Sequence, residues 1–103
     1  MEEKYKLRYL PLFYDDLTEI VDYVSMKLNN PDAALKLIND VERSIIQRKK
    51  CPEAFEPYKS HKRRAQPYYR IYVGNYIIYY VVLGEVMEVR RILYGKRNVD
   101  SYL

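Results

Sequence analysis

The sequence has little of the chemistry that metal sites, disulfides and membrane spans require. Cys51 is the only cysteine and His61 the only histidine, which excludes a disulfide framework and a cluster of metal-binding cysteines or histidines. No apolar run approaches the roughly 20 residues of a membrane span, and the acidic start Met1-Glu2-Glu3 is unlike a signal peptide. We therefore predict a cytoplasmic protein with no metal or other cofactor and no membrane partner.

The composition predicts a single globular domain covering residues 1–103. Hydrophobic residues make up 49% of the chain and charged residues 31%, a balance typical of folded proteins and unlike that of disordered ones. A chain of this length buries roughly two-thirds of the surface that its unfolded form exposes, which is enough for one core.

The net charge of +4 is unevenly distributed along the chain. Residues 1–57 contain nine Lys or Arg and eleven Asp or Glu, whereas residues 58–103 contain nine Lys or Arg and three Asp or Glu. Nine of the thirteen tyrosines also lie in the second half. A basic, tyrosine-rich half suggests a surface that faces a polyanion. A solvated basic face, with tyrosines packed on a sheet, explains the composition equally well.

Hydrophobic periodicity in the first half predicts one strand followed by two helices. Residues 4–10 alternate between apolar and basic side chains, as a half-buried strand does, and Pro11 closes it. From Leu12 to Leu28 the apolar residues follow helical spacing, with acids near the start to complement the helix dipole. Asn30 and Pro31 suit the start of a second helix that continues to about Lys50. Because the link between the two predicted helices is so short, we expect them to form an antiparallel helical hairpin.

The second half is predicted to form three antiparallel strands after a proline-containing loop at 51–67. The strands are expected at 68–73, 76–82 and 86–94, with a tight turn at Gly74-Asn75 and a second turn at 83–85. Residues 76–82 are apolar or aromatic at every position, which predicts a central strand covered on both faces.

This order of elements predicts an α+β fold in which an N-terminal strand and a three-stranded antiparallel meander form one twisted sheet. The helical hairpin is expected to cover one face of the sheet. The other face is then a working surface or the seat of a partner. Alternation places Arg70 between Tyr68 and Tyr72 on one face, and it places Glu88, Arg90 and Tyr94 together on a face of the last strand.

Two catalytic hypotheses do not fit the motifs. A phosphate-binding loop around Gly95-Lys96 would need a glycine five residues earlier and a Ser or Thr after the lysine, but those positions hold Arg90 and Arg97. Nucleophilic catalysis by Cys51 would need a base, and the only candidate, His61, lies in the predicted loop. Cys51 is better explained as a residue at a helix end.

Arginine and tyrosine side chains remain as candidate catalytic groups. They suit a reaction in which the 2′-OH of an RNA chain attacks the neighbouring phosphodiester. Such an enzyme must orient the chain, move protons and stabilise charge on the phosphorus. Arg70, Arg97, Tyr94 and Tyr102 are the predicted catalytic residues. His61, Lys62, Arg63, Arg90 and Lys96 are the predicted substrate-binding residues. Because surface arginines on a small sheet are more often solvated than catalytic, the constellation alone is weak evidence.

Nearly the whole chain resembles the RelE/ParE superfamily of toxins from bacterial type II toxin–antitoxin (plasmid stabilisation) systems. The likeness covers the opening "KYKLRYLP", the helices "YDDLTEIVDYV" and "NPDAALKLINDVERSI", and the final "YRIYVGNYIIYYVVLGEVMEVRRILYGKRN". The resemblance implies a twisted antiparallel sheet with a helical hairpin. It also implies a cognate antitoxin whose acidic C-terminal segment wraps the toxin, and contact with operator DNA only through that antitoxin.

The resemblance leaves two mechanisms open. Members similar to RelE cleave mRNA on the ribosome; Arg70, Arg97 and Tyr102 match their catalytic positions, but Ile77 stands where they have a further arginine. Members similar to ParE have a longer helical hairpin, lack that set and poison DNA gyrase; the hairpin here is similar to theirs. A degenerate module that binds only an antitoxin or nucleic acid is the alternative from another functional class. In either toxin Gly95 is expected to end the last strand in a tight turn that frees Lys96 and Arg97.

Overall fold

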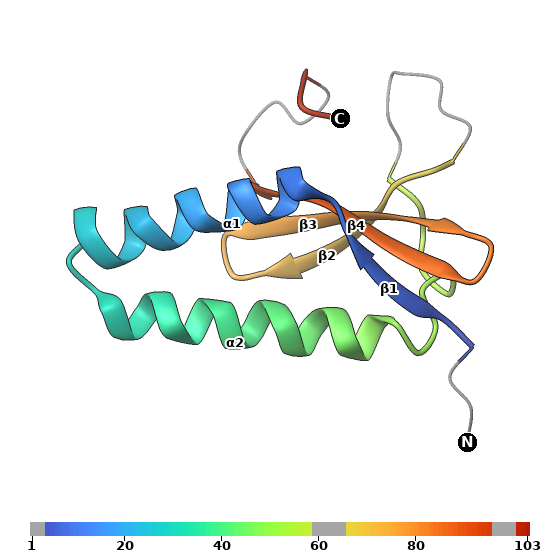
Figure 1. The fold of residues 1–103 in the computed structure, drawn as a ribbon, viewed down its shortest axis with the longest axis horizontal. Coiled ribbons are helices and arrows are strands. Elements are labelled where there is room, and N and C mark those ends of the chain that lie inside the picture. The colour runs from blue at the N-terminus through green and yellow to red at the C-terminus, as the bar shows by residue number, and fades with distance from the viewer. Residues whose placement is uncertain (1–3, 59–65, 96–100) are drawn as a thin grey trace.

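A helical hairpin packs on one face of a four-stranded sheet (Figure 1). The computed structural model describes residues 4–58, 66–95 and 101–103. In chain order the elements are β1 (Lys6–Tyr9), α1 (Pro11–Asp22), the π-helical segment η1 (Tyr23–Lys27), α2 (Pro31–Arg48), β2 (Tyr69–Val73), β3 (Tyr76–Leu83) and β4 (Val86–Tyr94). The predicted α+β fold and its order of elements are confirmed. Of the described helices, none is long and apolar enough to cross a membrane.

The sheet has the strand order β1-β4-β3-β2. β2, β3 and β4 form the predicted antiparallel meander. β1 pairs in parallel with β4, from Lys6 opposite Val86 to Tyr9 opposite Val89, so the sheet is mixed, whereas the resemblance implied a wholly antiparallel one. A parallel pair needs a long connection between its strands, and the two helices and the rest of the meander supply it.

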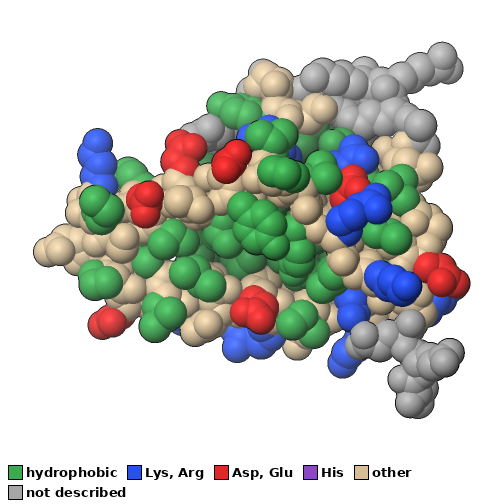
Figure 2. All heavy atoms as spheres, viewed as in Figure 1, with side chains coloured by type: hydrophobic (Ala, Val, Ile, Leu, Met, Phe, Trp, Pro, Cys, Tyr) green, Lys and Arg blue, Asp and Glu red, His purple; other side chains and the backbone are tan. Residues whose placement is uncertain are grey.

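The main core lies between the sheet and the helical hairpin. Phe13 of α1 and Ile45 of α2 pack there against Ile78, Tyr80 and other residues of the sheet. Because the apolar stripes of both helices point at the same sheet face, the helical periodicity of the sequence is satisfied by burial. Figure 2 shows hydrophobic side chains gathered between α1 and α2 on this side of the molecule.

The opposite face of the sheet carries a second, smaller hydrophobic cluster. Tyr79 and Val81 of β3 are 1% and 0% exposed there, which confirms that the central strand is covered on both faces. Tyr58 and Leu103 pack against this cluster from outside the sheet. The face that the sequence predicts as a working surface is therefore covered in part by the chain itself.

The helix ends differ in how their backbone groups are satisfied. Asn30 caps α2 as predicted, because its side-chain oxygen accepts a hydrogen bond of 3.1 Å from the Ala33 N–H, with Pro31 in the first turn. α1 begins at Pro11 itself, has no side-chain cap, and has no acid in its first turn. The expected acids near its start therefore lie further along, and Asp16 binds the sheet.

The first helix does not continue regularly to Leu28 as its periodicity predicts. It widens into η1, where the Leu28 N–H donates to the Tyr23 carbonyl at 3.0 Å, five residues back. Asn29 then adopts a positive φ of 51°, which asparagine tolerates better than most residues. The first helix of the hairpin thus ends in a π-helical turn. Such turns often occur at functional sites.

Arg48 joins the end of α2 to the sheet and to the segment that follows. Its Nη1 donates to the Arg70 carbonyl at 2.8 Å and to the Tyr80 hydroxyl at 3.0 Å. Its guanidinium lies 3.6 Å from the centre of the Phe55 ring. The Tyr80 hydroxyl in turn donates to the Pro52 carbonyl at 2.7 Å. Arg48 lies in the last turn of α2, where a cation complements the helix dipole, and it serves packing as well.

Candidate functional site

A bulge at Arg90 divides β4 into two parts that present different faces. Tyr80 of β3 pairs with Val89, and Tyr79 pairs with Arg91, so Arg90 is an extra residue without a partner position. Because side chains alternate strictly along a regular strand, one inserted residue reverses the faces beyond it. The prediction that Tyr94 shares a face with Glu88 and Arg90 is therefore wrong. Glu88 lies on the face of the sheet opposite the helices, here called the second face, and Tyr94 lies on the face that the helices cover.

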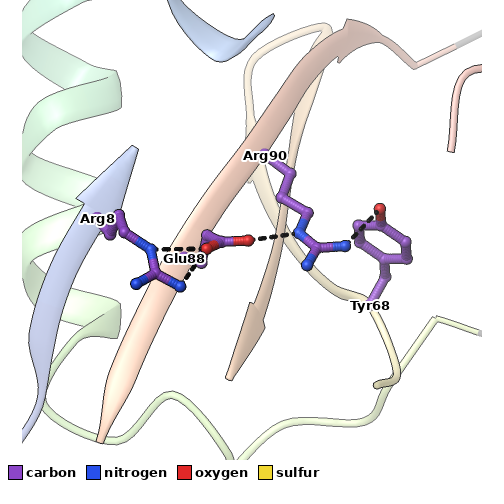
Figure 3. A network of polar contacts seen from close by, with 4 residues as sticks. All are labelled: Arg8, Tyr68, Glu88 and Arg90. Atoms are coloured by element: carbon purple, nitrogen blue, oxygen red, sulfur yellow. Dashed lines mark hydrogen bonds and ion pairs between the residues drawn. The ribbon is translucent and has the colours of Figure 1, made fainter. Parts of the chain in front are cut away.

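The second face carries a chain of polar contacts centred on Glu88 (Figure 3). Arg8 Nε donates to Glu88 Oε2 at 2.7 Å, and Arg90 Nε donates to Oε1 at 2.8 Å. Arg90 Nη1 also donates to the Tyr68 hydroxyl at 3.3 Å. The three elements β1, β4 and the segment before β2 are thus joined by one carboxylate and two guanidinium groups.

Glu88 is 5% exposed, yet it is held in the charged form. Burial by itself would raise its pKa, but the hydrogen bonds from Arg90 and Arg8 outweigh burial, so the pKa lies below the ordinary value. Burial lowers the pKa of Arg90, but the contacts with Tyr68 and Glu88 outweigh that effect and raise it. Glu88 thus forms ion pairs with two arginines, of which Arg8 is half-exposed.

Arg70 lies on the same face as this chain of contacts, between two tyrosine rings. Its guanidinium carbon is 5.1 Å from the centre of the Tyr58 ring and 5.7 Å from that of Tyr72. Tyr72 is 63% exposed. The predicted grouping of Arg70 with Tyr72 is confirmed, and this pair could stack on a planar group.

Tyr94 and Tyr102 lie in two other places. The Tyr94 ring is 5.9 Å from the Tyr76 ring, at the C-terminal end of β4. Tyr102 lies beside Arg91, whose guanidinium carbon is 5.5 Å from the tyrosine ring and whose Nη1 donates to the Tyr102 carbonyl at 3.1 Å. The described members of the predicted catalytic set therefore do not meet at one point.

The remaining predicted site residues lie outside the described residues. They are His61, Lys62, Arg63, Lys96 and Arg97. Their roles, like the catalytic roles of Arg70, Tyr94 and Tyr102, stay predictions. Over the ranges that the structure describes, no group of three His, Cys, Asp or Glu side chains could hold a metal ion.

Gly95 ends β4 for a reason other than conformational freedom. Its N–H donates to the Asn75 carbonyl at 2.9 Å, and a Cβ at this position would lie 3.3 Å from the same oxygen. The glycine therefore accommodates the close approach of the turn at residues 74–75, where a side chain would be crowded.

No sequence pattern singles out Arg91 and Asp16 as functional residues. Arg91 Nε and Nη2 bind the two carboxylate oxygens of Asp16. An acid near the start of a helix is usually solvated, so nothing local indicates this pair. By contrast, Glu88 stands between Met87 and Val89 in a predicted strand, and an acid in such a place signals a buried ion pair.

A family model described as the ParE toxin of the type II toxin–antitoxin system parDE matches residues 7–99. The chain belongs to this family. The match confirms the resemblance to the RelE/ParE superfamily and identifies a toxin domain of type II toxin–antitoxin systems. It also agrees with the length of the helical hairpin, which favoured the ParE branch.

Chains in solved structures of toxin–antitoxin systems are similar to this ParE-family chain. One comes from the chromosomal ParDE system of P. aeruginosa, with 18% identity over 92% of this chain and 100% of that one, and a TM-score of 0.72. Another comes from the RelB–RelE complex of Methanococcus jannaschii, with 22% identity over 93% and 99% and a TM-score of 0.51. At such identities the likeness shows a shared fold. No curated protein is significantly similar in sequence.

Proposed function

We propose that this toxin stops bacterial growth by binding DNA gyrase, without cleaving RNA, and that a cognate antitoxin neutralises it. The observation that carries the proposal is the dispersal of the described arginine and tyrosine residues over separate places on the sheet. Cleavage of a phosphodiester by its 2′-OH needs proton transfer and charge stabilisation at one phosphate. Arg70 and Tyr94 lie on opposite faces of the sheet and cannot both serve one phosphate.

The surroundings of the arginines support the same proposal. Arg90 is bound to Glu88 and Arg91 to Asp16, so both charges are largely neutralised within the fold. Ile77, at the position where RelE-like members have an arginine, packs against the hydrophobic cluster of the second face. A toxin that acts by binding needs a stable surface, and these pairs hold the surface of the sheet in one arrangement.

Two observations support a cognate antitoxin: the similar solved structures, and the charge of the second half of the chain. The similar structures come from a ParDE toxin–antitoxin system and a RelB–RelE antitoxin–toxin complex. The second half of this chain carries nine Lys or Arg against three Asp or Glu, which suits an acidic antitoxin segment. Contact with operator DNA would then pass through the antitoxin, in the cytoplasm of the cell.

Ribosome-dependent cleavage of mRNA is the second candidate, and one observation favours it. Arg70 lies between the rings of Tyr58 and Tyr72, an arrangement that can stack on a nucleobase. In this case Arg97 would supply charge to the phosphate and Tyr102 would move a proton. A module that only binds an antitoxin or nucleic acid is the third candidate.

Induced expression in a bacterial host separates the three candidates. Growth, mRNA 5′ ends and the DNA-damage response are followed together, and the purified chain is added to gyrase in a supercoiling assay. We expect growth arrest with DNA damage, intact mRNA and loss of supercoiling, and we expect Arg97→Ala to leave mRNA ends unchanged. New ends in translated mRNA that vanish with Arg97→Ala would replace the proposal with the nuclease. Normal growth with folded protein would leave the binding module.

A further inference from the structure

A cavity of about 480 Å³ opens between the helical hairpin and the end of β4. Three tyrosines from different elements line it: Tyr23 of η1, Tyr76 of β3 and Tyr94 of β4. Aliphatic side chains, among them Leu28 and Ile92, form other parts of its wall. Its volume falls in the range of pockets that hold a small ligand or an amino-acid side chain. Arg70, Glu88 and Arg90 are not among the residues that line this cavity.

The three tyrosines lie close to one another around the cavity. Burial raises the pKa of Tyr76, and the neighbouring hydroxyls of Tyr23 and Tyr94 raise it further. The rings of Tyr76 and Tyr94 are tilted at 60° to each other. The cavity thus offers aromatic faces and phenol oxygens, which together attract a cation that is also planar or partly apolar.

The charged residues among those that line the cavity are acids. Asp16 and Glu19 of α1 both line it, and no lysine, arginine or histidine is among the described lining residues. Asp16 is already occupied by Arg91 and by the Ile92 N–H. Glu19 is exposed and makes no ion pair within the described part of the chain. One carboxylate therefore remains available beside three aromatic rings.

We infer that this cavity binds an arginine side chain of a partner protein, with an apolar neighbour of that arginine against the aliphatic wall. A guanidinium can stack on the tyrosine rings and form paired hydrogen bonds with the Glu19 carboxylate. The cavity is larger than one arginine needs, so it has room for an adjacent aliphatic side chain. An acidic antitoxin segment would be repelled here, so the partner segment is a basic one. The inference holds whether the toxin acts on gyrase or on mRNA.

The test uses the full chain labelled with ¹⁵N and two capped dipeptides, N-acetyl-leucyl-arginine methylamide and its citrulline counterpart. Citrulline has nearly the shape of arginine but no charge. We expect saturable shifts of the Asn75, Ile92 and Tyr94 amide signals with the arginine peptide, in the millimolar range. We expect the citrulline peptide to bind about tenfold more weakly.

Two variants test the assigned groups, and a third serves as the control. Glu19→Gln removes the free carboxylate and Tyr23→Leu removes one exposed ring; each should weaken binding about fivefold. Glu85→Gln makes the same change of charge in the turn between β3 and β4, away from the cavity, and should leave binding unchanged. Equal binding of the two peptides, shifts outside the cavity, or equal effects of Glu19→Gln and Glu85→Gln would each overturn the inference.

Discussion

Asp16 of α1 and Arg91 of β4 form a two-point ion pair that fastens the first helix to the edge of the last strand. Arg91 Nε and Nη2 lie 2.7 and 2.8 Å from the two oxygens of Asp16. One of these oxygens also accepts the Ile92 N–H at 3.2 Å. β1 pairs with β4 only as far as Val89, so the backbone of β4 beyond Val89 has no neighbouring strand on that side. The Asp16 carboxylate accepts the Ile92 N–H there, as the carbonyl of a neighbouring strand would.

Asp16→Asn should destabilise the protein by about 2–4 kcal/mol, because it leaves Arg91 largely buried without a counter-charge. The measurement is urea unfolding followed by circular dichroism. Asp40→Asn is the matched control, since Asp40 pairs with Lys36 and Arg43 on the solvent side of α2, where such pairs contribute little. Equal losses in the two variants would show that the pair with Arg91 has no special role.

Glu88 should make stability depend on pH in the acid range. Its pKa in the folded protein lies below the ordinary value of 4.5, so its ionised form stabilises the fold above that value. This contribution is lost as pH falls below 4.5 and through the lower pKa of the folded state. Glu88→Gln should therefore be less stable than the parent at pH 7, by about 2–4 kcal/mol.

The difference in the free energy of unfolding between the Glu88→Gln variant and the parent should decrease steadily below pH 4.5. Unfolding free energies measured from neutral pH into the acid range check this expectation. Glu85→Gln, which changes an exposed acid three residues away, should show no such narrowing. A difference that stays constant with pH would mean that Glu88 acts through packing and not through its charge.

Arg48→Lys should loosen the segment that follows α2. A lysine cannot reproduce the two hydrogen bonds and the stacking on Phe55, and we expect a loss of about 1–2 kcal/mol. Limited proteolysis should also cut the chain faster near Phe55. Arg43→Lys, an exposed change on the same helix, is the control. Unchanged proteolysis in Arg48→Lys would contradict the role assigned to Arg48.

Gly95→Ala should be mildly destabilising, by about 0.5–1 kcal/mol. The added Cβ would lie 3.3 Å from the Asn75 carbonyl, which cannot withdraw without loss of its hydrogen bond with the Gly95 N–H. Loss of flexibility in the unfolded chain would act in the opposite direction. Thermal unfolding shows whether crowding by the new Cβ or the stiffer unfolded chain has the larger effect. If crowding dominates, the amide of residue 95 should also exchange faster. A more stable variant would show that the turn moves freely.

Much of the fold follows from local patterns in the sequence. Both helices, the three strands of the meander, the Asn30 cap and the Gly74-Asn75 turn depend on residues that are close together in the chain. The continuous apolar run of β3 was sufficient to predict a central strand, because only a strand covered on both faces can bury every side chain.

The candidate site depends on contacts that no local pattern encodes. Arg8 and Glu88 are 80 residues apart, and Asp16 and Arg91 are 75 apart. Both pairs depend on how β1 and α1 lie against β4. The prediction for Tyr94 failed because alternation assumes an unbroken period of two, and the bulge at Arg90 breaks it.

By itself the sequence determined the class of fold, the family and the set of basic and tyrosine residues available for function. The tertiary structure decided which of these residues are neutralised and which face solvent, because burial and ion pairing are properties of the packed sheet. One extra residue in β4 moved Tyr94 to the face of the helices, where it lines a cavity with Tyr23 and Tyr76. Such a displacement depends on the register between β3 and β4, which arises only when the two strands pair.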